Sequence, residues 1–386
     1  MHLAAHVPGA GDTDVRADPR SGPRIDFASF ERLARTAERG LFDLLLLAEK
    51  PRLREHEGTI HDLDVAGRPE SLTLLNALAA VTGRLGLAAT AGTTFNEPYE
   101  LARRLATLDH LSGGRAAWNV VTSSDASTGE NFRRGGFRDR AERYTRAAEF
   151  VATARELWDS WAPDGTPRPF AHQGRHFDIA GEFGLPRPPQ GHPVVVRAGD
   201  FEEGDGEGDS DEGREFAASS ADVIFSGWGS GGRPPGEHST RHGALEADRA
   251  FYADVKRRLA KYGRGPDDLK IMSGVTVVLG DTAAEAHERA EEIRRQQASP
   301  QTAPLTRGAP QFLVGTPGEV AAELVESVAR DAADGFVLVP HPTRGGLDEF
   351  VDRVVPLLQE RGAFRTAYEG TTLRSHLGLA DPVRKD

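Results

Sequence analysis

Apolar runs and amphipathic segments alternate along the whole chain. The run from Leu41 to Ala48 is apolar except for Asp43, as expected of a strand buried on both faces. Residues 25–39 instead carry apolar residues at helical spacing, and Gly40 follows as a common helix stop. The same alternation continues to the end of the chain. It predicts eight strands, each followed by a helix, near residues 2, 41, 84, 115, 193, 221, 269 and 335.

Regular alternation of strand and helix over 386 residues is typical of an α/β protein with a (β/α)8 TIM barrel and loop insertions. A doubly wound open sheet is the alternative. The number of predicted strands favours the barrel, as does the lack of a G-x-G-x-x-G motif after the first strand. No composition change marks a boundary between two halves. We therefore expect a single domain over residues 1–386, with a C-terminal helical extension at about 347–386.

The composition narrows the range of partners and chemistry. The chain has 59 acidic and 47 basic residues, a net charge of −12, which argues against nucleic acid or an anionic membrane as the main partner. It has no cysteine, which excludes disulfides, thiolate metal sites and cysteine nucleophiles. There is no apolar run long enough to span a membrane and no leader-like start, so we expect a cytoplasmic protein.

Short polar side chains gather in the stretch from Arg84 to Ser124, which reads as strand, loop, helix, turn and strand. This order of elements is one βαβ unit. Hydroxyl and amide groups cluster at the C-terminal ends of its two strands, at Thr90, Thr93, Thr94, Asn119, Thr122, Ser123 and Ser124. Ligands bind at that edge of a parallel sheet or barrel, so the cluster predicts a ligand site. Ordinary turn chemistry at strand ends is the alternative interpretation.

Four long stretches resemble a known family: LARRLATLDHLSGGRAAWNVVTSS, ERYTRAAEFVATARELWDSW, GTPGEVAAEL and RVVPLLQERGAFRTAYEGTTLRSHLGL. They are similar to the bacterial-luciferase-like flavin-dependent monooxygenases, in the nitrilotriacetate, pristinamycin and dibenzothiophene-sulfone monooxygenase branch. The resemblance implies a TIM barrel that assembles as a homodimer or homotetramer. It also implies that reduced FMN arrives from a separate NAD(P)H:flavin reductase, and that O2 oxygenates a small organic substrate.

The resemblance also assigns residues to the FMN site. Thr90 matches a threonine at the end of the third strand, and Asn119 falls in the strand beneath the flavin. Tyr144 matches the tyrosine of a His-x-x-x-Tyr helix motif, in which Arg140 takes the histidine position. Glu49 stands where the second strand of the family usually ends in aspartate. Neutral Thr and Asn groups suit the polar edge of the flavin ring.

The turn after the fifth strand differs from the family pattern. Gly199 and Ser210 match a turn that presents helix N–H groups and a hydroxyl to the FMN phosphate. Residues 200–208 are inserted between the two halves of that turn. The acidic residues within 209–212 would place carboxylates near a dianion, which is unfavourable unless Arg214, Arg197 or another cation offsets them.

Two other functions stay open at this point. The acidic insertion, Arg140 and the short segment 297–311 are compatible with a flavin-binding barrel that lacks oxygenase activity, and a deazaflavin-dependent oxidoreductase is a third possibility. The pattern identifies no catalytic residue. His6, at the end of the first strand, is the histidine that we place at the open end of the barrel, with a structural hydrogen-bonding role as the alternative. No histidines stand at metal-ligand spacing, so we expect no metal.

Overall fold

The computed structural model describes residues 1–7, 26–49, 69–122, 132, 140–198, 210–227, 241–297, 312–339 and 346–384. The barrel strands are β1 (His2–Val7), β2 (Leu44–Leu47), β3 (Gly86–Gly92), β4 (Ala116–Val121), β7 (Val194–Ala198), β8 (Val223–Gly227), β9 (Lys270–Leu279) and β11 (Gly335–Leu338). They pair in parallel in the order β9-β11-β1-β2-β3-β4-β7-β8, and β8 pairs with β9 to close the ring. The predicted (β/α)8 barrel is therefore confirmed.

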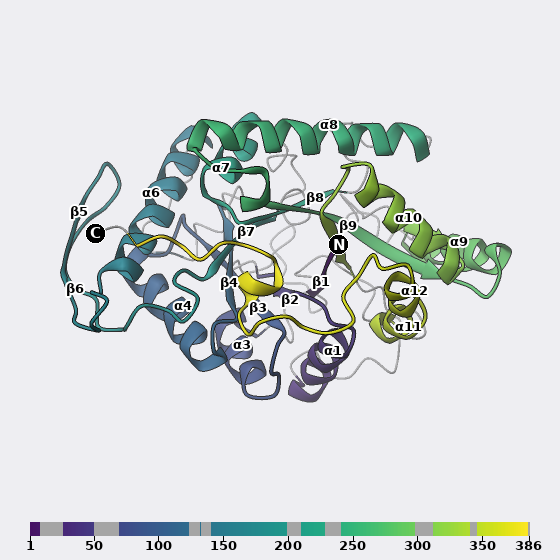
Figure 1. Ribbon diagram of the computed structural model, residues 1–386, viewed down its shortest axis with the longest axis horizontal. Helices are drawn as coiled ribbons and strands as arrows, with labels where there is room; N and C mark the ends of the chain where they lie inside the picture. Colours follow the sequence, from purple (N-terminus) through teal and green to yellow (C-terminus); the bar gives the residue numbers. More distant parts are fainter. Residues whose placement is uncertain are drawn as a thin grey trace, which may run out of the picture.

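Helices follow the strands and surround the barrel (Figure 1). They are α1 (Phe27–Arg39), α3 (Ser71–Ala79), α4 (Pro98–Ser112), α6 (Arg140–Asp159), α7 (Asp211–Ser220), α8 (Arg241–Leu259), α9 (Ala283–Gln297), α10 (Pro317–Ala329), α11 (Gly346–Arg353), α12 (Val355–Glu360) and α13 (Leu373–His376). Helix α4 shows how the sequence sets these bounds. Pro98 occupies its first turn, where a missing N–H costs no hydrogen bond, and Gly113 ends it with a left-handed φ of 69°.

Three strands lie outside the predicted set. β5 (Pro169–Gln173) and β6 (Asp178–Glu182) form an antiparallel hairpin, and β10 (Phe312–Gly315) pairs with the last residues of β9. The hairpin strands are short and mostly exposed, so they lack the continuous apolar pattern of the barrel strands. β10 is only four residues long and depends on the extension of β9 beyond its partner β11.

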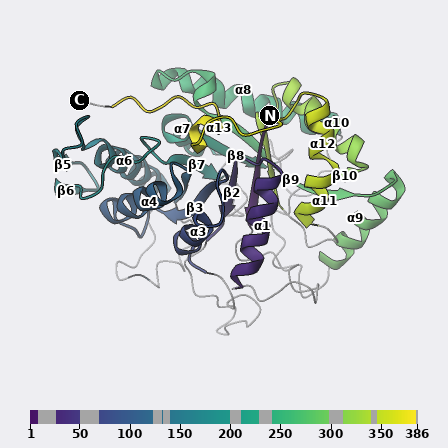
Figure 2. The same cartoon turned by 60° about the horizontal axis from the view of Figure 1, so that its bottom comes forward.

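The C-terminal segment covers the end of the barrel at which the strands begin, called here the N-terminal end (Figures 1 and 2). Leu373, Leu377 and Leu379 join the apolar cluster formed by inward-facing strand residues. The backbone N–H of Leu373 donates to the Gly114 carbonyl just before β4. A Cβ on Gly86, the first residue of β3, would lie 2.6 Å from Leu373 Cδ1, so glycine permits this close approach.

Two further expectations concern the chain as a whole. The single-domain organisation over residues 1–386 stays a prediction, because several segments lie outside the described residues. Among the described helices, none combines the length and the apolar character needed to cross a bilayer.

Candidate functional site

The C-terminal ends of β3 and β4 bring Thr90 and Asn119 together. The two residues are directly paired in the β3–β4 register. Each stands two residues after an alanine of the inward-facing cluster, Ala88 or Ala117, so both face the barrel interior. Asn119 Nδ2 donates to Thr90 Oγ1 at 3.0 Å, and both residues are buried. Thr90 and Asn119 of the predicted polar cluster therefore form part of the inner layer at this end of the barrel, whereas Ser123 and Ser124 lie outside the described residues.

The Asn119 side chain also links β4 to β7 through a hydrogen bond. Its Oδ1 accepts a hydrogen bond from the Ala198 backbone N–H at 3.0 Å. One amide thus donates to β3 and accepts from β7, which fixes its orientation. An aspartate at this position would lose the donor to Thr90. Gly199, the predicted phosphate-turn residue that follows Ala198, lies outside the described residues.

Glu49 lies at the rim of the same end. It follows β2, and its Oε2 accepts a hydrogen bond from the Ser71 N–H at 3.0 Å, at the start of α3. The Ser71 hydroxyl in turn donates to the Thr90 carbonyl at 3.1 Å. Burial raises the pKa of Glu49 above its usual range. Ser71 was not predicted as part of the site, although its position as the first residue of a helix beside a strand end was visible in the sequence.

Tyr144 reaches the same region from α6. The Arg197 guanidinium on β7 donates through Nη2 to Tyr144 Oη at 3.3 Å. The tyrosine ring is buried and lies 6.0 Å from the ring of Phe216 on α7. Arg140, the other predicted residue of this helix, is its first residue, and its side chain lies outside the described part of the structure.

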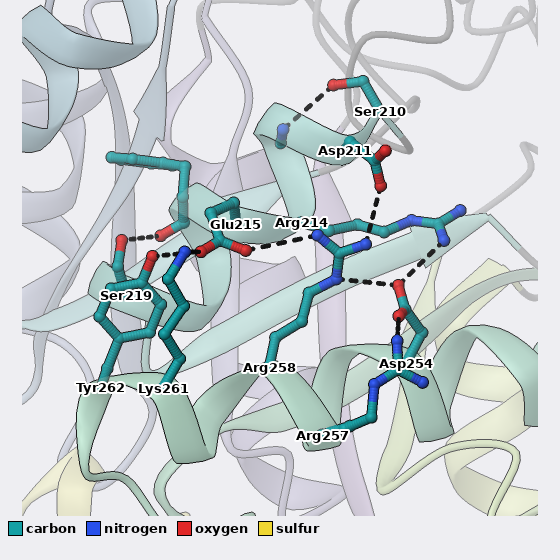
Figure 3. A network of polar contacts seen from close by, with 12 residues as sticks. Ser210, Asp211, Arg214, Glu215, Ser219, Asp254, Arg257, Arg258, Lys261 and Tyr262 are labelled. Carbon is teal, nitrogen blue, oxygen red and sulfur yellow. Dashed lines mark hydrogen bonds and ion pairs between the residues drawn. The ribbon is translucent and has the colours of Figure 1, made fainter.

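Ser210 directly precedes α7, where the predicted phosphate turn places it. Its hydroxyl accepts a hydrogen bond from the Gly213 N–H at 3.0 Å, which makes it the N-cap. Figure 3 shows that Asp211 points toward α8, where Arg258 pairs with it at 2.7 Å. Arg214 pairs with Asp254 at 3.2 Å. The cation that offsets the Asp211 carboxylate is therefore Arg258 rather than Arg214, and residues 200–208 lie outside the described residues.

His6 lies near the end of β1 and belongs to the inward-facing layer. It stands two residues after the inward-facing Ala4 and is 6 % exposed. Burial lowers the pKa of His6 to about 4, so the imidazole is neutral at pH 7. Its expected place at the C-terminal end of the barrel strands is confirmed.

The donor set at this end fits a flavin better than a metal ion. Among the described residues, the buried hydroxyls of Thr122 on the end of β4 and Thr276 on β9 have no hydrogen-bond partner. A buried hydroxyl without a partner is costly, which favours a polar ligand or water beside it. The described residues hold no group of His, Asp and Glu that could bind a metal. Neutral hydroxyl, amide and imidazole groups suit the hydrogen-bonding edge of a flavin ring.

The comparisons with known proteins agree with this geometry. The family model described as luciferase-like monooxygenase matches residues 5–363. Component A of nitrilotriacetate monooxygenase from Aminobacter aminovorans is 35 % identical, over 92 % of this chain and 91 % of that protein. Dibenzothiophene-sulfone monooxygenase from Rhodococcus erythropolis (strain XP) is 33 % identical, over 99 % of this chain and 97 % of that protein.

A solved structure extends the comparison to a flavin complex. Riboflavin lyase, crystallised with modified FMN and its substrate riboflavin, superposes with a TM-score of 0.85 at 25 % identity, covering 100 % of this chain and 97 % of that one. The match of the family model over most of the chain agrees with the closed barrel and with the resemblance seen in the sequence. The chain belongs to the luciferase-like monooxygenases, a family of two-component flavin-dependent oxidoreductases.

Proposed function

We propose that the chain is the oxygenating component of a two-component monooxygenase that uses reduced FMN and O2 to oxygenate a small organic substrate. The observation that carries the proposal is the inner layer of neutral polar groups around Asn119, at the ligand-binding end of a barrel of this family. The riboflavin lyase complex, which contains modified FMN, supports FMN as the cofactor.

The predicted site residues divide between the two ends of the flavin. Thr90 and Asn119 would hydrogen-bond the ring edge, and Tyr144 with Glu49 would flank it. The FMN phosphate would lie at the N-terminus of α7, near Ser210, with Gly199 and Arg140 as the remaining predicted contacts. When bound, reduced FMN supplies the electrons that activate O2.

The side chains of the chain would orient and enclose the reactants. The Asn119 amide is held by Thr90 and by the Ala198 N–H before any ligand arrives, so little reorganisation accompanies binding. The pKa of His6, lowered to about 4 by burial, keeps this imidazole neutral, so it adds no charge to the barrel interior at pH 7.

The remaining partners are proposed from the same family membership. We propose an NAD(P)H:flavin reductase as the source of reduced FMN, since the relative from Aminobacter aminovorans bears the name component A of its monooxygenase. A cytoplasmic homodimer or homotetramer completes the proposal. Nucleic acid and membrane are not proposed as partners, given the net charge of −12.

The proposal is tested by oxygen uptake with a flavin reductase, NADH and FMN, in the presence of candidate substrates such as nitrilotriacetate. We expect one substrate to give an oxygenated product that carries 18O from 18O2. The test variant is Asn119→Leu, which removes both hydrogen bonds of the amide and should abolish product formation. Flavin binding without any 18O-labelled product would instead favour a barrel without oxygenase activity, and selective binding of a deazaflavin would favour the deazaflavin-dependent alternative.

A further inference from the structure

A cavity of about 720 Å³ lies at the N-terminal end of the barrel, opposite the proposed flavin site. Its wall combines the end of α6, the β5 strand, the residues just before β7, β8 and β9, and the C-terminal tail. Figures 1 and 2 show that tail running past α6 toward the β5–β6 hairpin. Arg155, Arg168, Arg264 and Arg374 contribute four guanidinium groups to this wall.

The carboxylates in the wall already have partners. Asp222 pairs with Arg374 at 2.9 Å, Asp159 pairs with Arg187 at 3.0 Å and with His192 at 3.0 Å, and Glu156 pairs with His172 at 2.9 Å. The remaining carboxylate, that of Asp268, accepts the Gly265 N–H at 2.7 Å. Asp222 and Asp159 therefore pair with arginines other than Arg155, Arg168 and Arg264, and Glu156 pairs with a histidine.

These three arginines bond to carbonyl oxygens instead. Arg155 Nη2 donates to Ser220 O at 2.7 Å, Arg168 Nη2 donates to Asp159 O at 3.3 Å, and Arg264 donates to Ala218 O, Ala221 O and Asp268 O at 2.5–2.9 Å. Among the described residues, none of the three lies within ion-pair distance of a carboxylate. Most of these carbonyls belong to the end of α7, whose dipole offsets only about half a charge. These three guanidinium groups therefore line the cavity without a direct ion-pair partner among the described residues.

Burial raises the free-energy cost of keeping these arginines charged. Burial lowers the pKa of Arg155; Asp222 raises it, while Arg374 and Arg264 lower it further. The pKa of Arg264 is also lowered first by burial; Asp222 and Asp268 raise it, and Arg374 lowers it. A guanidinium stays protonated in proteins, so the cost is met by a counter-charge rather than by loss of a proton.

The wall also contains apolar side chains. Phe170 on β5 and Leu379 in the tail are buried, and Val383 is 87 % exposed at the outer part of the tail. A ligand suited to this wall would combine an oxyanion head with an apolar body. Guanidinium forks recognise carboxylate and phosphate oxygens bidentately, which gives the head its specificity.

We infer that this cavity is a second ligand site, which binds a small organic oxyanion through Arg155, Arg168 and Arg264. The shared chemistry of its ligands is an oxyanion on an apolar group, either a phosphate ester or a carboxylate. The inference does not rest on the proposed flavin function, because the flavin site lies at the other end of the barrel.

The test is calorimetric titration of the full chain with phenyl phosphate and, separately, with benzoate at constant ionic strength. FMN is present throughout at saturating concentration, so that it competes with phenyl phosphate for any flavin-phosphate site. We expect saturable binding of at least one probe with a Kd of about 1 mM or tighter, weakened at least about tenfold by Arg168→Gln. A preference for phenyl phosphate would identify phosphate esters as the ligand class, and a preference for benzoate would identify carboxylates.

Two variants keep the result interpretable. Arg155→Gln should weaken binding as Arg168→Gln does, but Arg155 also holds a carbonyl at the end of α7 and its loss can unfold the chain. Arg168 makes a single 3.3 Å bond, so its variant is expected to fold. Arg103→Gln, on the exposed face of α4, is the matched control and should leave the affinity unchanged. Absence of saturable binding, or equal affinity in Arg168→Gln and the parent, would overturn the inference.

Discussion

The two ends of the barrel differ in the kind of buried polar groups that they contain. At the N-terminal end, two buried aspartates are paired with arginines: Asp43 with Arg365, and Asp222 with Arg374. At the C-terminal end, the inward-facing buried groups of Thr90, Asn119 and His6 are neutral. Charge pairs are rigid and are destabilising when broken, whereas neutral groups can exchange hydrogen bonds with a ligand at low cost. The comparison indicates that paired charges stabilise the N-terminal end, whereas the neutral groups at the C-terminal end suit the proposed flavin site.

The largest expected effect comes from breaking a charge pair at the N-terminal end. Arg374→Met would leave Asp222 buried without its ion-pair partner and would remove the bond from Nε to the His192 carbonyl. We expect a loss of about 3–5 kcal/mol in the free energy of unfolding, measured by urea denaturation. The exposed Arg103→Met is the control and should lose far less. A loss equal to that of the control would mean that this pair does not hold the C-terminal segment in place.

The next effect concerns the neutral imidazole at the C-terminal end. The folded-state pKa of His6 is about 4, below its usual value of 6.5, so between these values the unfolded chain binds a proton that the folded chain does not. The free energy of unfolding should therefore fall by roughly 1–3 kcal/mol as the pH drops from 6.5 to 4. Asp109, whose pKa burial raises to about 6, acts in the opposite direction.

For that reason the His6 effect is measured as a difference. Urea denaturation of the parent and of His6→Gln, at several pH values between 4 and 7, should show a weaker pH dependence in the variant. Identical pH dependence in the two proteins would show that His6 is not held neutral by burial.

A smaller effect is expected from removing one hydroxyl in the neutral layer. Thr90→Val removes the acceptor of the Asn119 Nδ2 hydrogen bond and leaves the volume nearly unchanged. The expected cost is about 1 kcal/mol in stability and roughly tenfold in FMN affinity, since the amide loses its fixed orientation. Thr107→Val on the exposed face of α4 is the matched control. Equal FMN affinity in the two variants would remove Thr90 from the flavin site.

The smallest effect is expected at the acidic turn before α7. The Asp211 side chain is 84 % exposed and pairs with Arg258, so Asp211→Asn should leave FMN affinity within about twofold of the parent. Glu215→Gln, one turn later on the same helix, is the control. FMN binding that tightens several-fold in Asp211→Asn alone would show that this carboxylate repels the phosphate.

The barrel was predictable from the sequence because its strands are continuously apolar and each precedes a helix of clear periodicity. The run from Leu44 to Leu47 is an example, since all of its residues are buried. β10 was not predictable, because its four residues become a strand only by pairing with the end of β9. Tertiary pairing of this kind leaves little local signal.

The site was predictable in part. Thr90 and Asn119 stood at neighbouring strand ends, and the parallel register brings them into hydrogen-bond contact. The role of Arg258 was not visible, because the residue belongs to α8 and meets Asp211 only through the packing of two helices. Residues 47 positions apart in the chain give no periodic signal for such a pair.

The most direct test of the central claim is anaerobic titration of the purified chain with reduced FMN, followed by flavin absorbance. The account predicts a Kd of about 1 μM or tighter, weakened at least about tenfold by Asn119→Leu while Arg103→Gln leaves it unchanged. Absence of binding at about 100 μM reduced FMN, by a chain shown to be folded, would contradict the assignment of the C-terminal end as the flavin site.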